Sequence, residues 1–364
     1  MPLSWHAPLA EYLAQAERLL LALRSGDGPA RECFKWEHPR FHGRPLSDVS
    51  AEGLELGDAQ LVVAHRHAFD SWAELAAFAA PAGDGGDGPV PRFERAVEAV
   101  VSGDASALRA MLRAAPDLVH ARSSRRHHAT LLHYIAANGV EGSRQRTPRN
   151  AVEIATILLE AGAEPDALAD MYEQRCTTMS MLVSSTPPAD AGLQAALAGT
   201  LLDHGASLDG PGTKWRSPLM TALAFGFLDT ARALAGRGAP VDRLDVAAGL
   251  GMPDAAARLL PASDAADRHA ALALAAQHGH ADVVRLLLDA GEDPDRLNPD
   301  GHHSHATPLH HAALAGHRDV VTLLVQRGAR LEIRDAIYES TPLGWAEHGG
   351  QAALAEFLRG HGAS

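Results

Sequence analysis

Short stripes of apolar residues at helical spacing occur in pairs along most of this chain. In the clearest pair, one stripe lies in residues 309–313 and the next in residues 320–324. Thr307 can cap the first helix, and Gly316 can end it in a left-handed backbone conformation. The pattern predicts two short antiparallel helices, neither of which buries its apolar face without a neighbouring pair.

This paired unit recurs in phase along the sequence. The distance from the capping position to the closing glycine is 21 residues in four units, Thr307 to Gly328, Thr341 to Gly362, Ser217 to Gly238 and Ala270 to Gly291. Longer units run from Thr130 to Gly162 and from Thr177 to Gly205, a degenerate one covers residues 94–119, and a shortened one covers residues 246–260. Eight units over residues 91–364 predict a stacked solenoid, because each helix pair needs a neighbour to cover it.

The residues of these units resemble the ankyrin repeat. The resemblance rests on Thr307-Pro308-Leu309-His310, on Gly316-His317, and on Leu-Leu-x-x-Gly-Ala endings such as Leu201 to Ala206. It implies an all-α solenoid of about eight helix–turn–helix units with short β-hairpin tips. It also implies a concave groove, formed by those tips and the first helices, that presents a surface to a partner.

Residues 1–80 have a different character and predict a small helical region. Helical patterns cover residues 10–24, 54–64 and 71–78, with a loop rich in Pro, Gly and His at residues 37–43. Residues 58–64 and 69–75 resemble the N-terminal helical segment of a group of bacterial ankyrin-repeat proteins, which implies no defined activity. Within that segment we interpret Trp72 as a core anchor. Residues 81–91 predict a flexible linker, and residues 92–364 the repeat domain.

Composition narrows the function classes. The formal net charge of −13 opposes a nucleic-acid binder, which needs a basic face. Cys33 and Cys176 lie far apart and are typical of unpaired thiols in a reducing compartment. No apolar run is long enough to span a bilayer, so no membrane contact is predicted. We also predict a cytoplasmic location, a monomeric state and no cofactor.

Two repeats carry insertions between their paired helices. Residues 141–150 extend the unit that begins at Thr130, and residues 186–190 extend the unit that begins at Thr177. These segments are either contact elements for a partner or tolerated sequence drift, and the sequence does not decide between the two.

The predicted hairpin tips collect cations, histidines and aromatics, although the chain as a whole is acidic. Such residues on an exposed groove are typical of binding hot spots. We therefore predict that these residues line a groove that binds a partner protein. The bound part of the partner is a peptide, a protein surface or an anionic group, and we call the predicted contact residues the groove set. This set consists of Arg125, Arg126, His128, Tyr172, Arg175, Lys214, Trp215, Arg216, Phe225, His278, Tyr338, Trp345, Glu347 and His348.

A histidine-rich hairpin before Thr307 suggests an alternative function. His302, His303 and His305 could hold a metal, although no metal is required by any motif, and His348 lies one repeat further on. The alternative function is thus a metal-dependent or acid/base enzyme, or a small-ligand binder, in the C-terminal repeats. No H-E-x-x-H helix, nucleophile elbow or phosphate loop occurs in the sequence, and whether the chain is an enzyme stays open. His310 and His133 are expected to tie their own turns.

Overall fold

A computed structural model describes residues 7–80, 88–209 and 217–363 of the chain. These residues form short helices and one two-stranded hairpin, which confirms the predicted all-α fold. The chain folds into two compact units, residues 1–207 and residues 208–364. The predicted division at residues 81–91 stays a prediction, except that residues 89–91 already belong to a helix.

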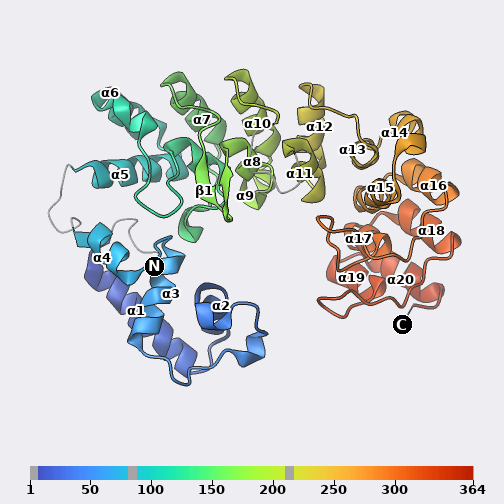
Figure 1. The fold of residues 1–364 in the computed structure, drawn as a ribbon, viewed down its shortest axis with the longest axis horizontal. Coiled ribbons are helices and arrows are strands. Elements are labelled where there is room, and N and C mark those ends of the chain that lie inside the picture. Colours follow the sequence, from blue (N-terminus) through green and yellow to red (C-terminus); the bar gives the residue numbers. More distant parts are fainter. Residues whose placement is uncertain (1–6, 81–87, 210–216, 364) are drawn as a thin grey trace. The chain divides into compact units, whose positions relative to one another are not determined.

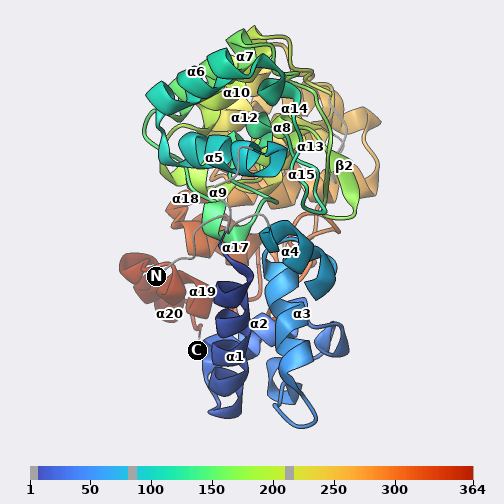
Figure 2. The ribbon, with the colours of Figure 1, turned by 90° about the vertical axis from the view of Figure 1, so that its left-hand side faces the viewer.

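Unit 1 begins with a helical region that has its own core. Its helices are α1 (Leu9–Arg24), α2 (Gly28–Glu37), α3 (Leu56–Arg66) and α4 (Trp72–Ala79), with 3-10 turns η1 (Pro39–Phe41) and η2 (Leu46–Asp48). The helices α1 and α3 lie side by side (Figure 2). Tyr12, Phe34 and Leu75 are among the buried residues, and Trp72 packs against this core from a partly buried position.

The helix α2 has no counterpart in the sequence prediction. Asp27 caps it by accepting a hydrogen bond from the Ala30 amide at 2.8 Å, and a proline occupies the first turn. The helix buries only Ala30 and Phe34. Its apolar stripe was therefore too sparse to be recognised from periodicity.

The remainder of unit 1 is a stack of helix pairs (Figure 1). Its elements are α5 (Pro89–Ser102), α6 (Ala105–Ala114), η4 (Pro116–His120), η5 (Leu131–Ala136), η6 (Gly142–Arg144), α7 (Ala151–Glu160), β1 (Ala169–Met171), β2 (Gln174–Cys176), α8 (Thr178–Leu182), α9 (Thr186–Asp190) and α10 (Gln194–Asp203). The first helix of the second pair, η5, is a 3-10 helix instead of the expected α-helix. The insertion at 186–190 forms the short helix α9 instead of a turn.

The strands β1 and β2 form an antiparallel hairpin in which Ala169 pairs with Cys176 and Met171 with Gln174. Tyr172 and Glu173 form its two-residue turn, and both have positive φ angles, 51° and 61°. Two consecutive left-handed residues are the geometry of a type I′ turn, whose twist matches that of the strands. The hairpin presents the Tyr172 side chain to solvent.

Among its described residues, unit 2 contains five helix pairs, and the last four share one apolar core. They are α11 (Pro218–Ala224) with α12 (Leu228–Gly236), α13 (Leu244–Gly249) with α14 (Pro253–Leu259), α15 (Ala265–Gln277) with α16 (Ala281–Asp289), α17 (Pro308–Ala315) with α18 (Arg318–Gln326), and α19 (Pro342–His348) with α20 (Ala352–Gly360), and η7 (Leu260–Ala262) follows α14. Small alanines and larger leucines and valines from successive pairs fill the core. Each pair thus covers its neighbour, as the solenoid prediction requires.

The start and the end of α17 are fixed by the residues that define the repeated unit. The Oγ1 atom of Thr307 lies 2.8 Å from Nδ1 of His310, and Nε2 of His310 donates to the Ser340 carbonyl at 3.2 Å. Gly316 ends α17 with a φ of 78°, in the left-handed region that favours glycine. His133 makes the equivalent contact with Thr130 in unit 1. Both histidines therefore tie turns.

Candidate partner-binding groove

Arg125 does not belong to an exposed groove, and this part of the prediction was wrong. Its side chain is 1% exposed. It donates to the His67 carbonyl at 2.7 Å and lies over the rings of Phe69 and Phe78, at 5.0 and 4.5 Å from their centroids. The hairpin that carries Arg125 is thus covered by the N-terminal region of the same chain.

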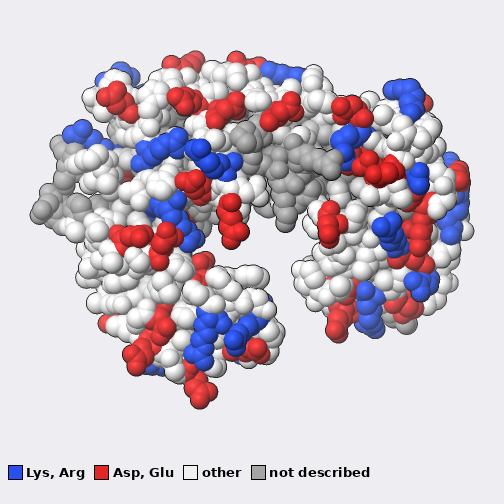
Figure 3. Space-filling view, viewed as in Figure 1, with Lys and Arg blue, Asp and Glu red and all other residues white. Residues whose placement is uncertain are grey.

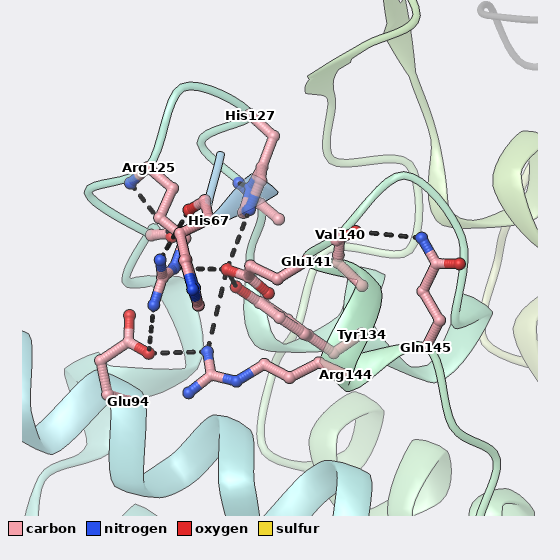
Figure 4. A network of polar contacts seen from close by, with 11 residues as sticks. His67, Glu94, Arg125, His127, Tyr134, Val140, Glu141, Arg144 and Gln145 are labelled. Carbon is pink, nitrogen blue, oxygen red and sulfur yellow. Dashed lines mark hydrogen bonds and ion pairs between the residues drawn. The ribbon is translucent and has the colours of Figure 1, made fainter. Parts of the chain in front are cut away.

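Two buried carboxylates hold the Arg125 guanidinium (Figure 4). Its Nε lies 2.5 Å from Glu141, and its Nη2 lies 3.5 Å from Glu94. Arg144 lies 2.6 Å from Glu94, and the Tyr134 hydroxyl donates to Glu141 at 3.1 Å. Burial alone would raise the pKa of Glu141, but Arg125 and neighbouring donors outweigh it and hold that pKa well below its usual range.

The insertion at 141–150 supplies two members of this network, Glu141 and Arg144. Both side chains are at most 3% exposed, so these two residues of the segment pack inside the protein. It connects the second repeat to α5 and to the region around α4. A backbone hydrogen bond from Arg126 to the Ala68 carbonyl at 2.9 Å completes the attachment.

The other predicted residues of unit 1 are exposed, and their charges are already paired. Arg126 lies 3.7 Å from Asp70, and both His128 and Arg175 lie within 4.0 Å of Asp170. Arg126, Tyr172 and Arg175 border a cavity of about 870 Å³. Since carboxylates sit beside these cations, this face offers little unpaired positive charge to an anionic group.

Unit 2 contains a larger groove, of about 1130 Å³, that brings distant segments together. Of the predicted groove set it collects five residues, Phe225, His278, Tyr338, Trp345 and His348, together with His303 and His305 of the histidine-rich hairpin. Lys214, Trp215 and Arg216 lie outside the described residues. Glu347 does not line this groove and forms an ion pair with Arg359.

The first helices of several pairs, and the residues that directly follow them, contribute side chains to the groove. Phe225 follows the end of α11, His278 follows the end of α15, and Trp345 lies in α19. The histidine-rich hairpin folds back over this row, with Nε2 of His303 donating to the Ala224 carbonyl at 3.1 Å. His303 has a φ of 58°, so the contact depends on a left-handed backbone turn.

Asp335 fixes the last wall of the groove. Its carboxylate accepts from the backbone amides of Ile337, Tyr338 and Ser340 at 2.6 to 3.1 Å, and from the Trp345 indole at 3.0 Å. Burial opposes ionisation, but these donors lower the pKa of Asp335 to about 2. The indole ring is thereby held in place, while the Tyr338 side chain remains 71% exposed.

Two buried histidines of the groove have pKa values below the ordinary value of an imidazole. Burial lowers the pKa of His278 to about 4. Burial together with the neighbouring imidazoles lowers the pKa of His311 to about 3. His311 lies 4.9 Å from the His303 ring and 5.2 Å from the Trp345 ring, between centroids. Its Nε2 atom has no hydrogen-bond partner among the described residues.

His311 was not among the predicted site residues. The signal that could have found it is its position directly after the His310 that ties the turn, on the helix face that carries Trp345 one repeat later. The sequence indicated a metal possibility for His302, His303 and His305 instead. Within residues 7–80, 88–209 and 217–363, no group of three or more His, Cys, Asp or Glu side chains is arranged to hold a metal ion. His302 is buried and does not line the groove.

Comparison with known proteins agrees with this architecture. A family profile described as ankyrin repeats (3 copies) matches residues 244–335, inside unit 2. Bovine cyclin-dependent kinase 4 inhibitor B is 32% identical over 117 residues, which cover 24% of this chain and 88% of that protein. The chain therefore belongs to the ankyrin-repeat family, and it is a protein-interaction module.

Two further relatives match over shorter stretches. An ankyrin repeat-containing protein of Schizosaccharomyces pombe is 41% identical over 70 residues, 19% of this chain and 31% of that protein. Human cyclin-dependent kinase 4 inhibitor B is 37% identical over 81 residues, 22% of this chain and 56% of that protein. Neither of these two matches spans two thirds of the relative. In the part of the chain that the structure describes, no helix is long and apolar enough to cross a membrane.

Proposed function

We propose that this protein binds a partner protein through the groove of unit 2, with Phe225, Tyr338 and Trp345 as its contact residues. The observation that carries the proposal is the convergence of predicted contact residues from α11, α15, α19 and two hairpins on one cavity of about 1130 Å³. Phe225 and Tyr338 are 41% and 71% exposed. Exposed aromatic side chains that line a concave surface are typical of binding hot spots.

The burial and ion pairing of the hairpin residues in unit 1 support the groove of unit 2 as the binding surface. The hairpin that carries Arg125 is occupied by the N-terminal region, and Arg126, His128 and Arg175 lie beside carboxylates. The bovine relative's name describes an inhibitor of a kinase, so an ankyrin-repeat chain of related sequence acts on another protein.

Selection from a display library of random short peptides on the purified full-length protein tests the proposal. Replacing both Phe225 and Tyr338 by Ala should weaken the selected peptides by at least about tenfold in Kd, measured by calorimetry, because two hot-spot contacts are lost. Tyr172→Ala, which removes an exposed aromatic of unit 1, should leave the affinity unchanged. Equal binding by the double variant and the wild type would show that the groove is not the contact surface.

An enzyme or small-ligand site in the histidine-rich hairpin stays a prediction, as do a cytoplasmic location and a monomeric state. At about 1130 Å³, the groove lies near the upper end of the roughly 300–1,000 Å³ of small-ligand pockets. We propose a peptide over a small ligand because five of the predicted partner-contact residues line this groove.

A further inference from the structure

The groove of unit 2 has an unusual lining among the residues that the structure describes. Its lining includes no Lys, Arg, Asp or Glu. The chain as a whole has 32 Lys and Arg residues and 45 Asp and Glu residues, so a lining of this size without any of them is a distinctive feature. In Figure 3 the left-hand margin of unit 2, around α17 and α19, is mostly white, while red and blue side chains crowd its right-hand margin.

Aromatic rings form much of this uncharged wall. The ring of His305 lies 5.8 Å from that of Trp345 and 6.1 Å from that of Tyr338, between centroids. His303 and His311 extend the row toward Phe225. Leu228 and Leu314 add aliphatic surface. An aromatic side chain inserted here would meet ring edges and faces on several sides, an arrangement that favours aromatic pairs over other apolar contacts.

We propose that the groove selects an uncharged segment of its partner, anchored by an aromatic side chain that packs against His303, His305 and Trp345. The inference rests on the proposed function of the same groove. A charged anchor is disfavoured because its ionised group would leave water without meeting a Lys, Arg, Asp or Glu side chain in the described lining. His311, which is 7% exposed and lines the groove, adds an imidazole nitrogen without a partner in the described part of the chain.

Synthetic analogues of one selected peptide test the proposal on the full-length protein. The aromatic anchor is first located by alanine replacement, and it is then exchanged for phenylalanine, 4-carboxyphenylalanine or 4-guanidinophenylalanine. These three residues share one ring and differ in charge. The phenylalanine peptide should bind at least about tenfold more tightly than either charged analogue, measured by calorimetry at neutral pH.

The controls separate this proposal from the proposed function. Tyr338→Ala should weaken the phenylalanine peptide, whereas Trp36→Ala, which removes an exposed aromatic of α2, should not. If groove variants weaken the peptides but a charged analogue binds as tightly as phenylalanine, the neutral-anchor proposal is overturned and the groove assignment stands. If no selected peptide responds to the groove variants, both are overturned.

Discussion

At the scale of single residues, histidine plays several different parts in this protein. His310 and His133 close turns through both ring nitrogens, as their position after Thr-x-Leu predicts. His303 reaches across to the Ala224 carbonyl and thereby holds a hairpin over the groove. His311 is buried without a hydrogen-bond partner for Nε2 among the described residues. Burial and local donors, and not the residue type, decide which part each histidine plays.

The burial of His311 predicts a loss of stability in acid. Its folded-state pKa of about 3 lies below the ordinary value, so between about pH 6.5 and pH 3 the unfolded chain binds a proton that the folded chain does not. Stability therefore falls as the pH falls through this window, by up to about 2 kcal/mol at pH 5 for a shift of this size. The imidazoles of His303, His305, His310 and His278 face the same site and oppose its protonation.

Replacing His311 by Phe should remove the part of the acid-induced loss in the free energy of unfolding that comes from this histidine. Urea unfolding of the full-length protein at pH 7.5 and pH 5, followed by circular dichroism, measures the difference. His361→Phe, at an exposed position of the same unit, is the matched control and should retain the wild-type pH dependence. An equal acid loss in His311→Phe and wild type would contradict the assignment.

At the scale of elements, hairpins decide what the repeats can bind. The hairpin with Arg125 docks the N-terminal region, and the hairpin with His303 covers one end of the groove. The last hairpin is folded around Asp335, which collects three backbone amides and the Trp345 indole. A single carboxylate thus organises a loop and positions an aromatic wall.

Asp335→Asn should destabilise the protein and disturb this wall. An amide oxygen cannot replace a carboxylate toward four donors, and a hydrogen bond to a charged group contributes about 1.5–3 kcal/mol, so a loss of roughly that size is expected. Because the folded pKa is lowered to about 2, the wild-type advantage is present above about pH 4 and disappears as the pH falls toward 2.

Thermal unfolding across that pH range measures the effect, with Asp319→Asn as an exposed control near the start of α18. The peptide affinity of the groove should fall with Asp335→Asn and not with the control. A variant as stable as wild type at neutral pH would show that the Asp335 contacts do not hold the hairpin.

At the scale of the whole molecule, the two units are stabilised by different means. Unit 2 relies on a continuous apolar core between helix pairs. Unit 1 joins two separate structures, the N-terminal helices and the first repeats, through the buried network of Arg125, Glu94, Glu141 and Arg144. Removing one partner from a buried ion network costs much more than its net contribution suggests, because the remaining charges stay buried and unpaired.

Arg125→Leu should therefore destabilise unit 1, by about 3–5 kcal/mol, and leave unit 2 unaffected. Hydrogen exchange of the full-length protein should show faster exchange in α3, α4 and η5, with unchanged protection in α15 and α17. Arg126→Leu is the control, since its side chain is exposed and its ion pair with Asp70 is long. Uniform loss of protection in both units, or none in unit 1, would contradict this division.

The sequence by itself determined the repeat architecture and most of the helix positions. The Thr-Pro-Leu-His unit specifies caps, turns and apolar stripes through contacts among residues close in sequence. The helix pair that it forms can therefore be predicted from the local sequence. It also indicated Phe225, Tyr338, Trp345 and His348 as neighbours on one surface, because the repeat places equivalent positions on one face. Of the eleven members of the predicted groove set that the structure describes, five line the cavity in unit 2.

Only the tertiary structure decided which charges are exposed. Arg125 lies in a hairpin that is polar in any ankyrin repeat. The residues next to it in the sequence do not indicate that the N-terminal region covers it. The insertion at 141–150 similarly acquired its role from Glu94, which is 47 residues away from Glu141 in the sequence. Burial and ion pairing depend on segments far apart in the chain, and for that reason periodicity and spacing could not predict them.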